Sequence, residues 1–349
     1  MSRKEPGISE AELRTKYSEE VQELKRKLTS KDRQIEDYRR SHGSIMTLFD
    51  SIKDSIPIYP KNKIEYRKPK KSRIDTPCGI CLLISDSHYG AIQMASEIEG
   101  FGEFSPEICE KRSMKFIEES IEWTELQRSN YRIDKAHVLV VGDLISGDIH
   151  HELSVTNAFP GPQQVVGAAR ILASQISALQ PHFSEVIVHF ITEDNHARLT
   201  KKPQAKEAGI NSFNYLVGIM AQQMLIQLST VSFNIYPQYE AVVDVEGRKY
   251  LLLHGHNIMG WAGFPWYGVE RKVAKEAIKR LNAPDFKRFH KVIMGHWHTP
   301  ISHPIYWIGG SVSGTDAYDH KNGRHGEPTQ SSWLVHPKHG EFARIDWKL

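Results

Sequence analysis

Five short apolar runs, each followed closely by polar side chains that can bind a metal ion, constrain the fold of this 349-residue chain most strongly. The runs are rich in β-branched residues, and most have the length of a buried strand. They occupy residues 80–85, 137–141, 186–192, 250–253 and 291–294. In an open α/β sheet, residues beyond the carboxyl ends of strands can meet although they are far apart in sequence. We therefore expect one site to contain the side chains that follow the runs: Asp86, His88, Asp143, Asn195, His254, His296 and His298.

The chemistry of these seven side chains indicates a reactive metal site. Carboxylates, imidazoles and one carboxamide, without a thiolate, suit Mn, Fe or Zn, whereas a structural zinc site would favour cysteines. Seven ligands are too many for one tetrahedral ion. Two divalent ions about 3.5 to 4 Å apart would use all of them and would clamp the attacking and leaving oxygens of a phosphoryl displacement. Asp143 is the predicted bridge, because Asp86 already forms an Asp-x-His pair with His88.

Each part of this pattern has an ordinary structural alternative. The chain has 18 histidines and a second His-x-His pair, His254-Gly255-His256, so one such pair indicates little. A Gly-Asp step such as Gly142-Asp143 is common in turns. The order of the motifs and their shared position after apolar runs favour the metal site.

Together the motifs resemble those of the calcineurin-like metallophosphoesterase superfamily, in that superfamily's order, over residues 78 to 349. They are Asp86-Ser87-His88, Gly142-Asp143, Asp194-Asn195-His196, His254-Gly255-His256 and Gly295-His296-Trp297-His298. The resemblance implies an α/β fold, a double-β-sandwich flanked by helices. It implies one metal bound by Asp86, His88, Asp143 and His298, and another bound by Asp143, Asn195, His254 and His296. It also implies that His196 protonates the leaving oxygen or steadies the phosphate.

The third motif departs from the superfamily, which usually has glycine before the Asn-His pair and a carboxylate after it. Asp194 and Ala197 occupy those positions here. Asp194 or Glu193 is therefore the candidate to orient His196 in place of the missing carboxylate. Arg198 follows, and it is either a planar fork that binds a phosphate oxygen or a surface side chain.

The second motif distinguishes branches of the superfamily. The Ser/Thr phosphatases have Gly-Asp-x-Val-Asp-Arg-Gly, whereas this chain has Gly-Asp-Leu-Ile-Ser-Gly-Asp at residues 142–148. The continuation to His150 and His151, together with the aromatic loop at Trp261, is more similar to the nuclease and phage-type members. The repair-nuclease branch has a further histidine here that contacts substrate. His150 or His151 is the candidate for that catalytic role, and an ordinary loop histidine is the alternative.

The first 55 residues differ in kind from the rest. Residues 10–40 are highly charged and lack Gly and Pro. Apolar or aromatic residues recur at heptad spacing, at Val21, Leu24, Leu28, Ile35, Tyr38 and Ile45. This seam predicts a coiled-coil helix, and we expect a homo-oligomer formed through residues 1–55. A solvated or core-docked helix is the alternative.

A basic linker is predicted over residues 56–77, before the metallophosphoesterase domain at 78–349. Within residues 61–73, seven Lys or Arg against one Glu give a charge of +6, while the whole chain carries +3. Such a run can neutralise nucleic-acid phosphates, although basic linkers are often only solvated. The candidate phosphate-binding residues are Lys68, Lys70, Lys71 and Arg73.

Aromatic side chains near the proposed ligands could bind nucleobases. Trp261 and Trp266 belong to a loop with four aromatic residues that follows His254. Stacking on bases is the functional interpretation, and packing against the helix predicted at 269–281 is the structural alternative. Tyr89, beside His88, is a similar candidate.

The remaining features are those of a globular enzyme. The chain is 40% apolar and 25% charged, which is typical of globular proteins. No apolar run approaches a membrane span, and the N-terminus lacks a signal-peptide core. We expect a protein of the cytoplasm, bacterial or in a phage-infected cell, without membrane contact. Cys78, Cys81 and Cys109 predict no disulfide framework. Helices are predicted at 106–128, 162–179 and 204–228, with strands over 231–253 and short strands over 305–349.

We therefore predict a dinuclear metal-dependent phosphodiesterase that cleaves DNA or another nucleic acid by in-line attack of a metal-bridging hydroxide. Mn²⁺ is the expected ion, with Fe, Zn, Ni or Mg as alternatives. Small or cyclic nucleotides are the alternative substrates, because they need the same metals but no extended basic surface. A noncatalytic scaffold on this fold is a third possibility, disfavoured because all seven ligands are present.

Overall fold

The computed structural model describes residues 17–32, 56–60, 76–149, 151–259 and 264–349. The chain divides into two compact units, residues 1–55 and 56–349. In the first unit, residues 17–32 form a helix on which Val21, Leu24 and Leu28 are exposed. The rest of the predicted heptad seam and residues 61–75 of the basic linker lie outside the described residues. Self-association through the seam stays a prediction.

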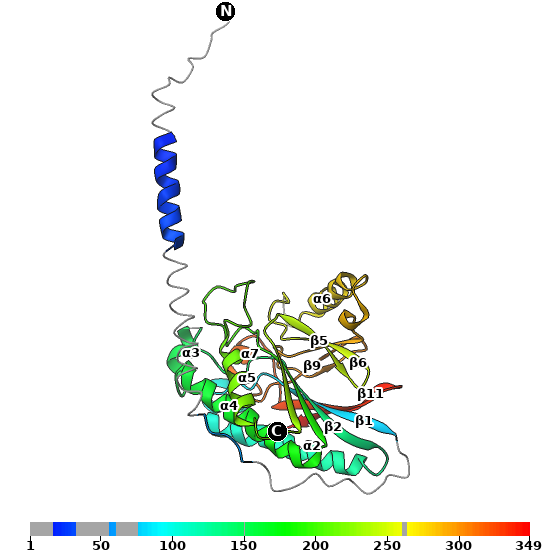
Figure 1. Ribbon diagram of the computed structural model, residues 1–349. Helices are drawn as coiled ribbons and strands as arrows, with labels where there is room; N and C mark the ends of the chain where they lie inside the picture. The colour runs from blue at the N-terminus through cyan, green and yellow to red at the C-terminus, as the bar shows by residue number, and fades with distance from the viewer. Residues whose placement is uncertain (1–16, 33–55, 61–75, 150, 260–263) are drawn as a thin grey trace, which may run out of the picture. The chain divides into compact units, whose positions relative to one another are not determined.

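The first sheet of the larger unit has six strands in the order β11-β10-β1-β2-β3-β4 (Figure 1). Its first four strands in the chain are parallel, while β10 is antiparallel to β1 and β11 to β10. The strands are β1 (Pro77–Ile84), β2 (Arg132–Val140), β3 (Glu185–Ile191), β4 (Val231–Tyr236), β10 (Thr329–His336) and β11 (Gly340–Lys348). The last two are longer than the short C-terminal strands predicted.

The second sheet has five strands in the order β5-β6-β7-β9-β8. β6, β7 and β9 are parallel, and β5 and β8 are antiparallel edge strands. The predicted turn at Glu246-Gly247 joins β5 to β6, and both residues have positive φ. The strands are β5 (Glu240–Val245), β6 (Arg248–Leu253), β7 (Lys291–Met294), β8 (Ile301–Ser302) and β9 (Tyr306–Ile308).

The two sheets pack face to face. Alternate residues of β1, Cys81 and Leu83, point into the interface and meet apolar residues of the second sheet, as the two-residue period of a strand requires. The buried cluster between the sheets contains Leu139, Val141, Ile191, Val243, Val245, Tyr250, Leu252, Ile293, Trp307, Trp333 and Val335. The predicted double-β-sandwich is confirmed.

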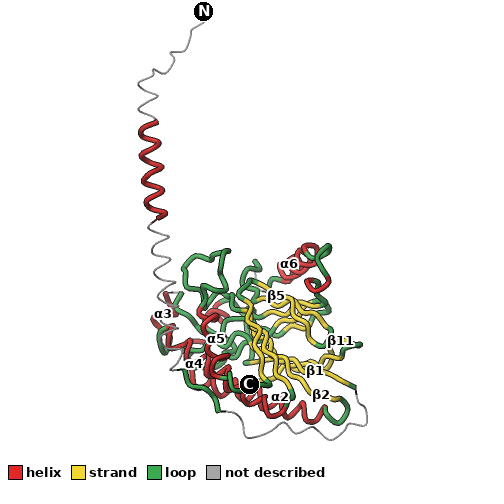
Figure 2. The backbone as a smooth tube through the Cα atoms, viewed as in Figure 1, coloured by secondary structure: helices red, strands yellow, loops and turns green. Residues whose placement is uncertain are grey.

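Helices cover the outer faces of both sheets (Figure 2). α2 (Pro106–Gln127), α4 (Gly161–Leu179) and α5 (Phe213–Met224) lie on the first sheet, and α6 (Trp266–Lys279) packs on the second through Val269 and Val273. The helix predicted at 204–228 is shorter, because Ser212 caps it and residues 204–212 form bends and turns. The remaining helical elements are η2 (Ala95–Ile98), α3 (His151–Thr156), η3 (Gln180–His182), η4 (Asp285–Lys287) and α7 (Ala317–Lys321).

Within the described residues, every helix is too short or too polar to span a lipid bilayer. The three cysteines are free and buried, and burial raises the pKa of Cys109 to about 12. They are therefore poor nucleophiles at neutral pH and act as small packing side chains.

His189 makes the stability of the sandwich depend on pH. Its ring is 5% exposed and stacks between His137 and Tyr236. Burial, with a smaller contribution from His137, lowers its pKa to about 3. Because the unfolded chain takes up the proton near pH 6.5 and the folded protein does not, the free energy of unfolding should fall as the pH drops below about 6.5.

We expect His189 to destabilise the protein by about 2 kcal/mol at pH 5 relative to pH 7. Urea unfolding of metal-free wild type and His189→Phe at both pH values measures this, since the variant should lose that part of the acid sensitivity. An equal loss of stability in the two proteins would contradict the assignment.

Candidate metal centre

The proposed ligands all follow the carboxyl ends of parallel strands. Asp86 and His88 follow β1, Asp143 follows β2 and Asn195 follows β3, all in the first sheet. In the second sheet, His254 follows β6, while His296 and His298 follow β7. The parallel strands of both sheets end at one edge of the sandwich, and the seven side chains lie together there.

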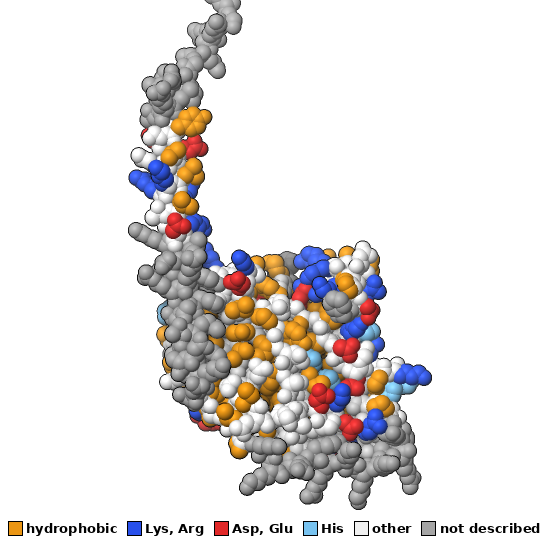
Figure 3. Space-filling view, viewed as in Figure 1, with side chains coloured by type: hydrophobic (Ala, Val, Ile, Leu, Met, Phe, Trp, Pro, Cys, Tyr) orange, Lys and Arg blue, Asp and Glu red, His pale blue; other side chains and the backbone are white. Residues whose placement is uncertain are grey.

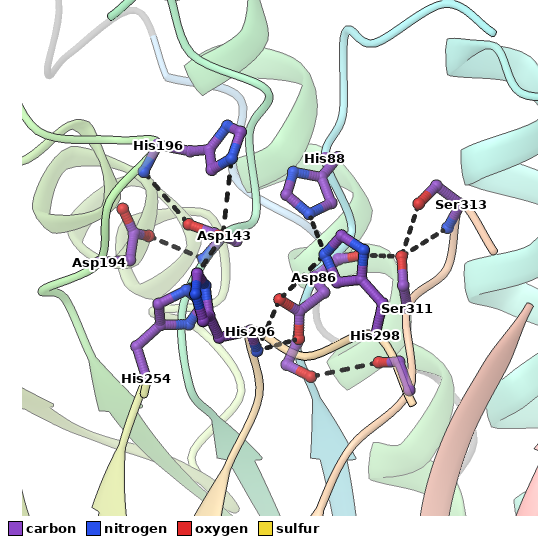
Figure 4. A network of polar contacts seen from close by, with 12 residues as sticks. Asp86, His88, Asp143, Asp194, His196, His254, His296, His298, Ser311 and Ser313 are labelled. Carbon is purple, nitrogen blue, oxygen red and sulfur yellow. Dashed lines mark hydrogen bonds and ion pairs between the residues drawn. The ribbon is translucent and has the colours of Figure 1, made fainter. Parts of the chain in front are cut away.

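Three overlapping groups of side chains form a continuous polar centre (Figure 4). In each group, the possible ligand atoms lie within 4.8 Å of one another. The groups are Asp86, His88 and His298; His88, Asp143 and His196; and Asp143, His254 and His296. His88 and Asp143 each belong to two groups, so the centre is large enough for more than one ligand set. Asn195 joins it with Oδ1 3.0 Å from His254 Nε2.

Acceptor atoms converge in this centre. His254 Nε2 is 3.0 Å from Asp143 Oδ2 as well as from the Asn195 oxygen. The Nε2 atoms of His88 and His298 lie 3.0 Å apart. Without a proton between them, these atoms would direct lone pairs at one another. A cation satisfies such converging acceptors, so the residues fit divalent metal ions.

Hydrogen bonds behind the imidazoles hold them in the form that binds metal. His254 Nδ1 donates to the Val141 carbonyl at 2.8 Å, and His298 Nδ1 lies 2.8 Å from Asp319 Oδ2. A carbonyl only accepts, so Nδ1 of His254 carries a proton and Nε2 faces the centre. Such partners fix the orientation and raise the basicity of metal-binding histidines.

The electrostatics of the metal-free centre favour cations. Burial opposes protonation of His254, but the Asp143 carboxylate outweighs it and raises the pKa to about 10. Burial is likewise outweighed at His298, where Asp319 raises the pKa to about 9. Burial and neighbouring histidines lower the pKa of His88 and His296. Protons therefore occupy part of the centre, and metal binding would displace them.

The backbone of the centre is strained. Asp86, His88, Asp143, His296 and His298 all have φ between 45° and 72°. Left-handed non-glycine residues cost about 1 to 3 kcal/mol each and cluster at functional sites. Space excludes a side chain at Gly142, because a Cβ there would lie 2.7 Å from His254 Nδ1. The left-handed backbone that turns these side chains toward one another is therefore locally unfavourable in free energy, and the rest of the fold stabilises it.

His196 faces the centre without the expected carboxylate behind it. Its Nδ1 donates to the Ser146 carbonyl at 2.6 Å, and its Nε2 is 4.0 Å from Asp143 Oδ2. The prediction that Asp194 or Glu193 orients this ring is wrong. Asp194 accepts bonds from the backbone N–H groups of Asp143 and Ala197 and from the Asn214 side chain, and Glu193 pairs with His256.

The candidate substrate residues have different surroundings. Tyr89 is 7% exposed and its ring lies against Phe159, so in this structure a base could not stack on it. Arg198 donates to the Thr200 and Lys201 carbonyls and lines a small pocket with Glu193. His151 begins α3 with an exposed side chain. His150, Trp261, Lys68, Lys70, Lys71 and Arg73 lie outside the described residues.

Trp266 is exposed and is connected to the centre through other aromatic rings. Its ring centroid is 4.5 Å from that of Phe264, which is 5.5 Å from Trp297. The Trp297 ring in turn lies 5.0 Å from that of His296. Phe264 therefore packs against neighbouring rings, while Trp266 is 54% exposed at the start of α6. Base stacking on Trp266 stays a prediction.

Sequence reasoning missed supporting residues of the centre. Asp319 orients His298 from α7, a helix within residues 305–349, where the sequence pattern predicts only short strands. The other oxygen of Asp319 is 3.0 Å from Arg324. Ser311 donates to the Asp86 carbonyl (Figure 4). The sequence signal for α7 was the spacing of two aspartates. Asp316 caps the helix, and Asp319 is the third helical residue, whose N–H donates to the cap.

Comparisons with known proteins assign no family to this chain. A scan with protein-family models and a search of curated proteins found no match. A predicted phosphoesterase of Streptococcus pneumoniae is 11% identical over 77% of this chain and 97% of its own, with a TM-score of 0.28. Vacuolar Protein Sorting 29 from Cryptosporidium parvum is 14% identical over 79% and 100%, with a TM-score of 0.31. Zinc-complexed Vps29 from Entamoeba histolytica is 11% identical over 76% and 98%, with a TM-score of 0.28. Similarity this weak carries no weight for function.

Proposed function

We propose that this protein is a dinuclear metal-dependent phosphodiesterase that cleaves nucleic acid, with DNA as the preferred substrate. The overlap of the three side-chain groups, through His88 and through Asp143, carries the proposal. Asp143 is 1% exposed and lies between His254 and His196, where one carboxylate can serve two ions. The sequence motifs of this chain resemble those of the nuclease and phage-type metallophosphoesterases. The proposed location of the protein is the cytoplasm of a bacterial or phage-infected cell.

Two ligand sets would share Asp143. One comprises Asp86, His88, Asp143 and His298, and the other comprises Asp143, Asn195, His254 and His296. Bound there, divalent ions would neutralise phosphate charge and lower the pKa of water. Mn²⁺ is the preferred ion because the donors are oxygen and imidazole nitrogen without thiolate, and Fe, Zn, Ni or Mg are alternatives.

His196 would assist departure of the leaving alkoxide. Because its Nδ1 is bonded to a carbonyl, only Nε2 can exchange a proton with substrate. Nε2 lies 4.0 Å from Asp143 Oδ2, and His196 forms one of the side-chain groups with His88 and Asp143. A phosphodiester held there would therefore place an oxygen within reach of a general acid.

The start of α6 supports a nucleic-acid substrate. Trp266 and Tyr267 are 54% and 74% exposed, and the Arg271 guanidinium lies over the Tyr267 ring. Four Lys or Arg against two Glu make α6 basic, and Figure 3 shows blue side chains gathered around it. Exposed aromatic rings beside basic groups can bind single-stranded nucleic acid by stacking and by charge.

Small or cyclic nucleotides are the alternative substrates. They would need the same metal centre but no contact with the basic surface of α6. Metal-stripped protein supplied in turn with Mn, Mg, Zn and Ni should be assayed on DNA, RNA, cyclic dinucleotides and a chromogenic diester. Cleavage of cyclic dinucleotides without cleavage of DNA would favour the alternative. No turnover of any diester would reject phosphodiesterase activity and favour a scaffold.

Trp266→Ala should weaken single-stranded DNA binding by about 1 to 3 kcal/mol, because one stacking platform is lost. Hydrolysis of the small chromogenic diester should stay unchanged, since that substrate does not reach α6. Ile278→Ala is the matched control, an exposed apolar truncation at the other end of the same helix. Equal DNA affinity of Trp266→Ala and wild type would exclude this surface.

The basic linker provides a second arm of the same binding experiment. Replacement of Lys68, Lys70, Lys71 and Arg73 by Ser should lower the slope of log affinity against log salt by about 0.7 to 0.9 for each lost phosphate contact. An unchanged slope would remove the linker from the proposed DNA surface.

A further inference from the structure

One peptide unit connects His196 to a buried glutamine on α4. The carbonyl of Ser146 accepts the His196 Nδ1 hydrogen at 2.6 Å. The N–H of the same peptide unit, that of Gly147, donates to Gln164 Oε1 at 2.8 Å. The two hydrogen bonds are therefore in series, and rotation of this peptide would break both. Bonds in such a chain also polarise one another.

Gln164 is itself held in one orientation. Its side chain is fully buried, and its Nε2 donates to the Phe159 carbonyl at 2.8 Å. Since that carbonyl only accepts, the amide nitrogen must face Phe159 and the amide oxygen must face Gly147. Asp148 adds a nearby link, accepting from the Gly161 N–H at the start of α4 at 2.6 Å.

Close packing leaves this arrangement little freedom. Gly147 has φ of 70°, and a Cβ there would overlap the His196 carbonyl oxygen. A Cβ at Gly90, next to the first-motif loop, would lie 2.6 Å from Gln164 Cγ. The Ser146 N–H donates to the Tyr89 carbonyl at 3.0 Å, and this bond connects the loop after β2 to the loop after β1.

We propose that Gln164 is a positioning residue that, through the 146–147 peptide, holds the His196 ring with Nδ1 protonated and Nε2 directed at the metal centre. This role substitutes for the carboxylate that follows the Asn-His pair elsewhere in the superfamily and that Ala197 replaces here. The kinetic part rests on the proposed phosphodiesterase function, whereas the orientation of His196 does not.

The orientation can be tested without metal or substrate. In metal-free protein labelled with ¹⁵N-histidine, at alkaline pH, His196 should show a single tautomer with the proton on Nδ1. His196→Gln assigns the signal. Gln164→Leu should give a mixture of tautomers, because the Ser146 carbonyl is no longer fixed. Gln164→Glu keeps an acceptor for the Gly147 N–H but loses the donor to the Phe159 carbonyl, so it should give less of the second tautomer than Gln164→Leu.

Kinetics provide the second readout. Gln164→Leu should lower kcat for a diester with a poor leaving group by about 10- to 100-fold, the range typical of residues that support a site's ligands. KM and metal content should change little. In a His196→Ala background, the same substitution should have no further effect, since the two residues act in one chain.

Gln175→Leu is the matched control. Gln175 is a second buried glutamine of α4, and it donates to the Ser113 carbonyl away from His196. Its loss should reduce stability without changing the tautomer of His196. A wild-type tautomer in Gln164→Leu would overturn the proposal, as would equal kcat losses in the two leucine variants or losses that multiply with His196→Ala. If wild type cleaves no diester, the proposed function fails, but the tautomer still decides the role of Gln164.

Discussion

Asp143→Asn should abolish diester hydrolysis and weaken both bound metal ions together. The substitution is nearly isosteric, but it removes the one negative charge that both ligand sets would share. His254 Nε2 lies 3.0 Å from Asp143 Oδ2, so the loss would also disturb a neighbouring ligand. Loss of a group that only supports a ligand costs about 10- to 100-fold in affinity or activity, and a shared ligand should cost more.

Metal analysis after gel filtration checks this result, with kcat measured in parallel. We expect about two ions per chain in wild type and fewer than one in Asp143→Asn. Asp244→Asn is the control, the same change near the end of β5, where the side chain accepts from the Gly247 N–H of the turn to β6. Retention of two ions by Asp143→Asn would show that this carboxylate is not the bridge.

His196→Ala should lower kcat by about 10² to 10⁴ and leave metal content nearly intact. Its Nε2 faces the centre, but the seven ligands are complete without it. The loss should be largest for diesters with an alkoxide leaving group and small for a nitrophenolate, which departs without protonation.

Metal content and leaving-group dependence together show whether His196 acts as a metal ligand or as a general acid. His196→Ala and the exposed His339→Ala are assayed on diesters with good and poor leaving groups, alongside metal analysis. An equal loss of rate for both leaving groups would exclude proton transfer by His196. A lost ion would instead make His196 a ligand, which its place in a group with His88 and Asp143 allows.

Much of the centre was predictable because its signal is local. Each proposed ligand stands within four residues of the end of a strand, and a few consecutive β-branched residues predict a strand. The parallel order of β1, β2 and β3 then requires their carboxyl ends to meet at one edge. The predicted start of α5 was wrong. Apolar residues within 204–212 follow helical spacing, but Ser212 caps the helix, which begins only after it.

The sequence alone determined the types of the proposed ligands and of His196, their order and the strand ends that carry them. Only the tertiary structure decided what holds them: the Ser146 carbonyl behind His196, Asp319 behind His298, and the Gly147 contact to Gln164. Backbone carbonyls are present at every residue, so no residue type marks the one that will accept a bond. Which carbonyl faces a given imidazole depends on how the loops pack against α4 and α7, through contacts between residues far apart in the chain.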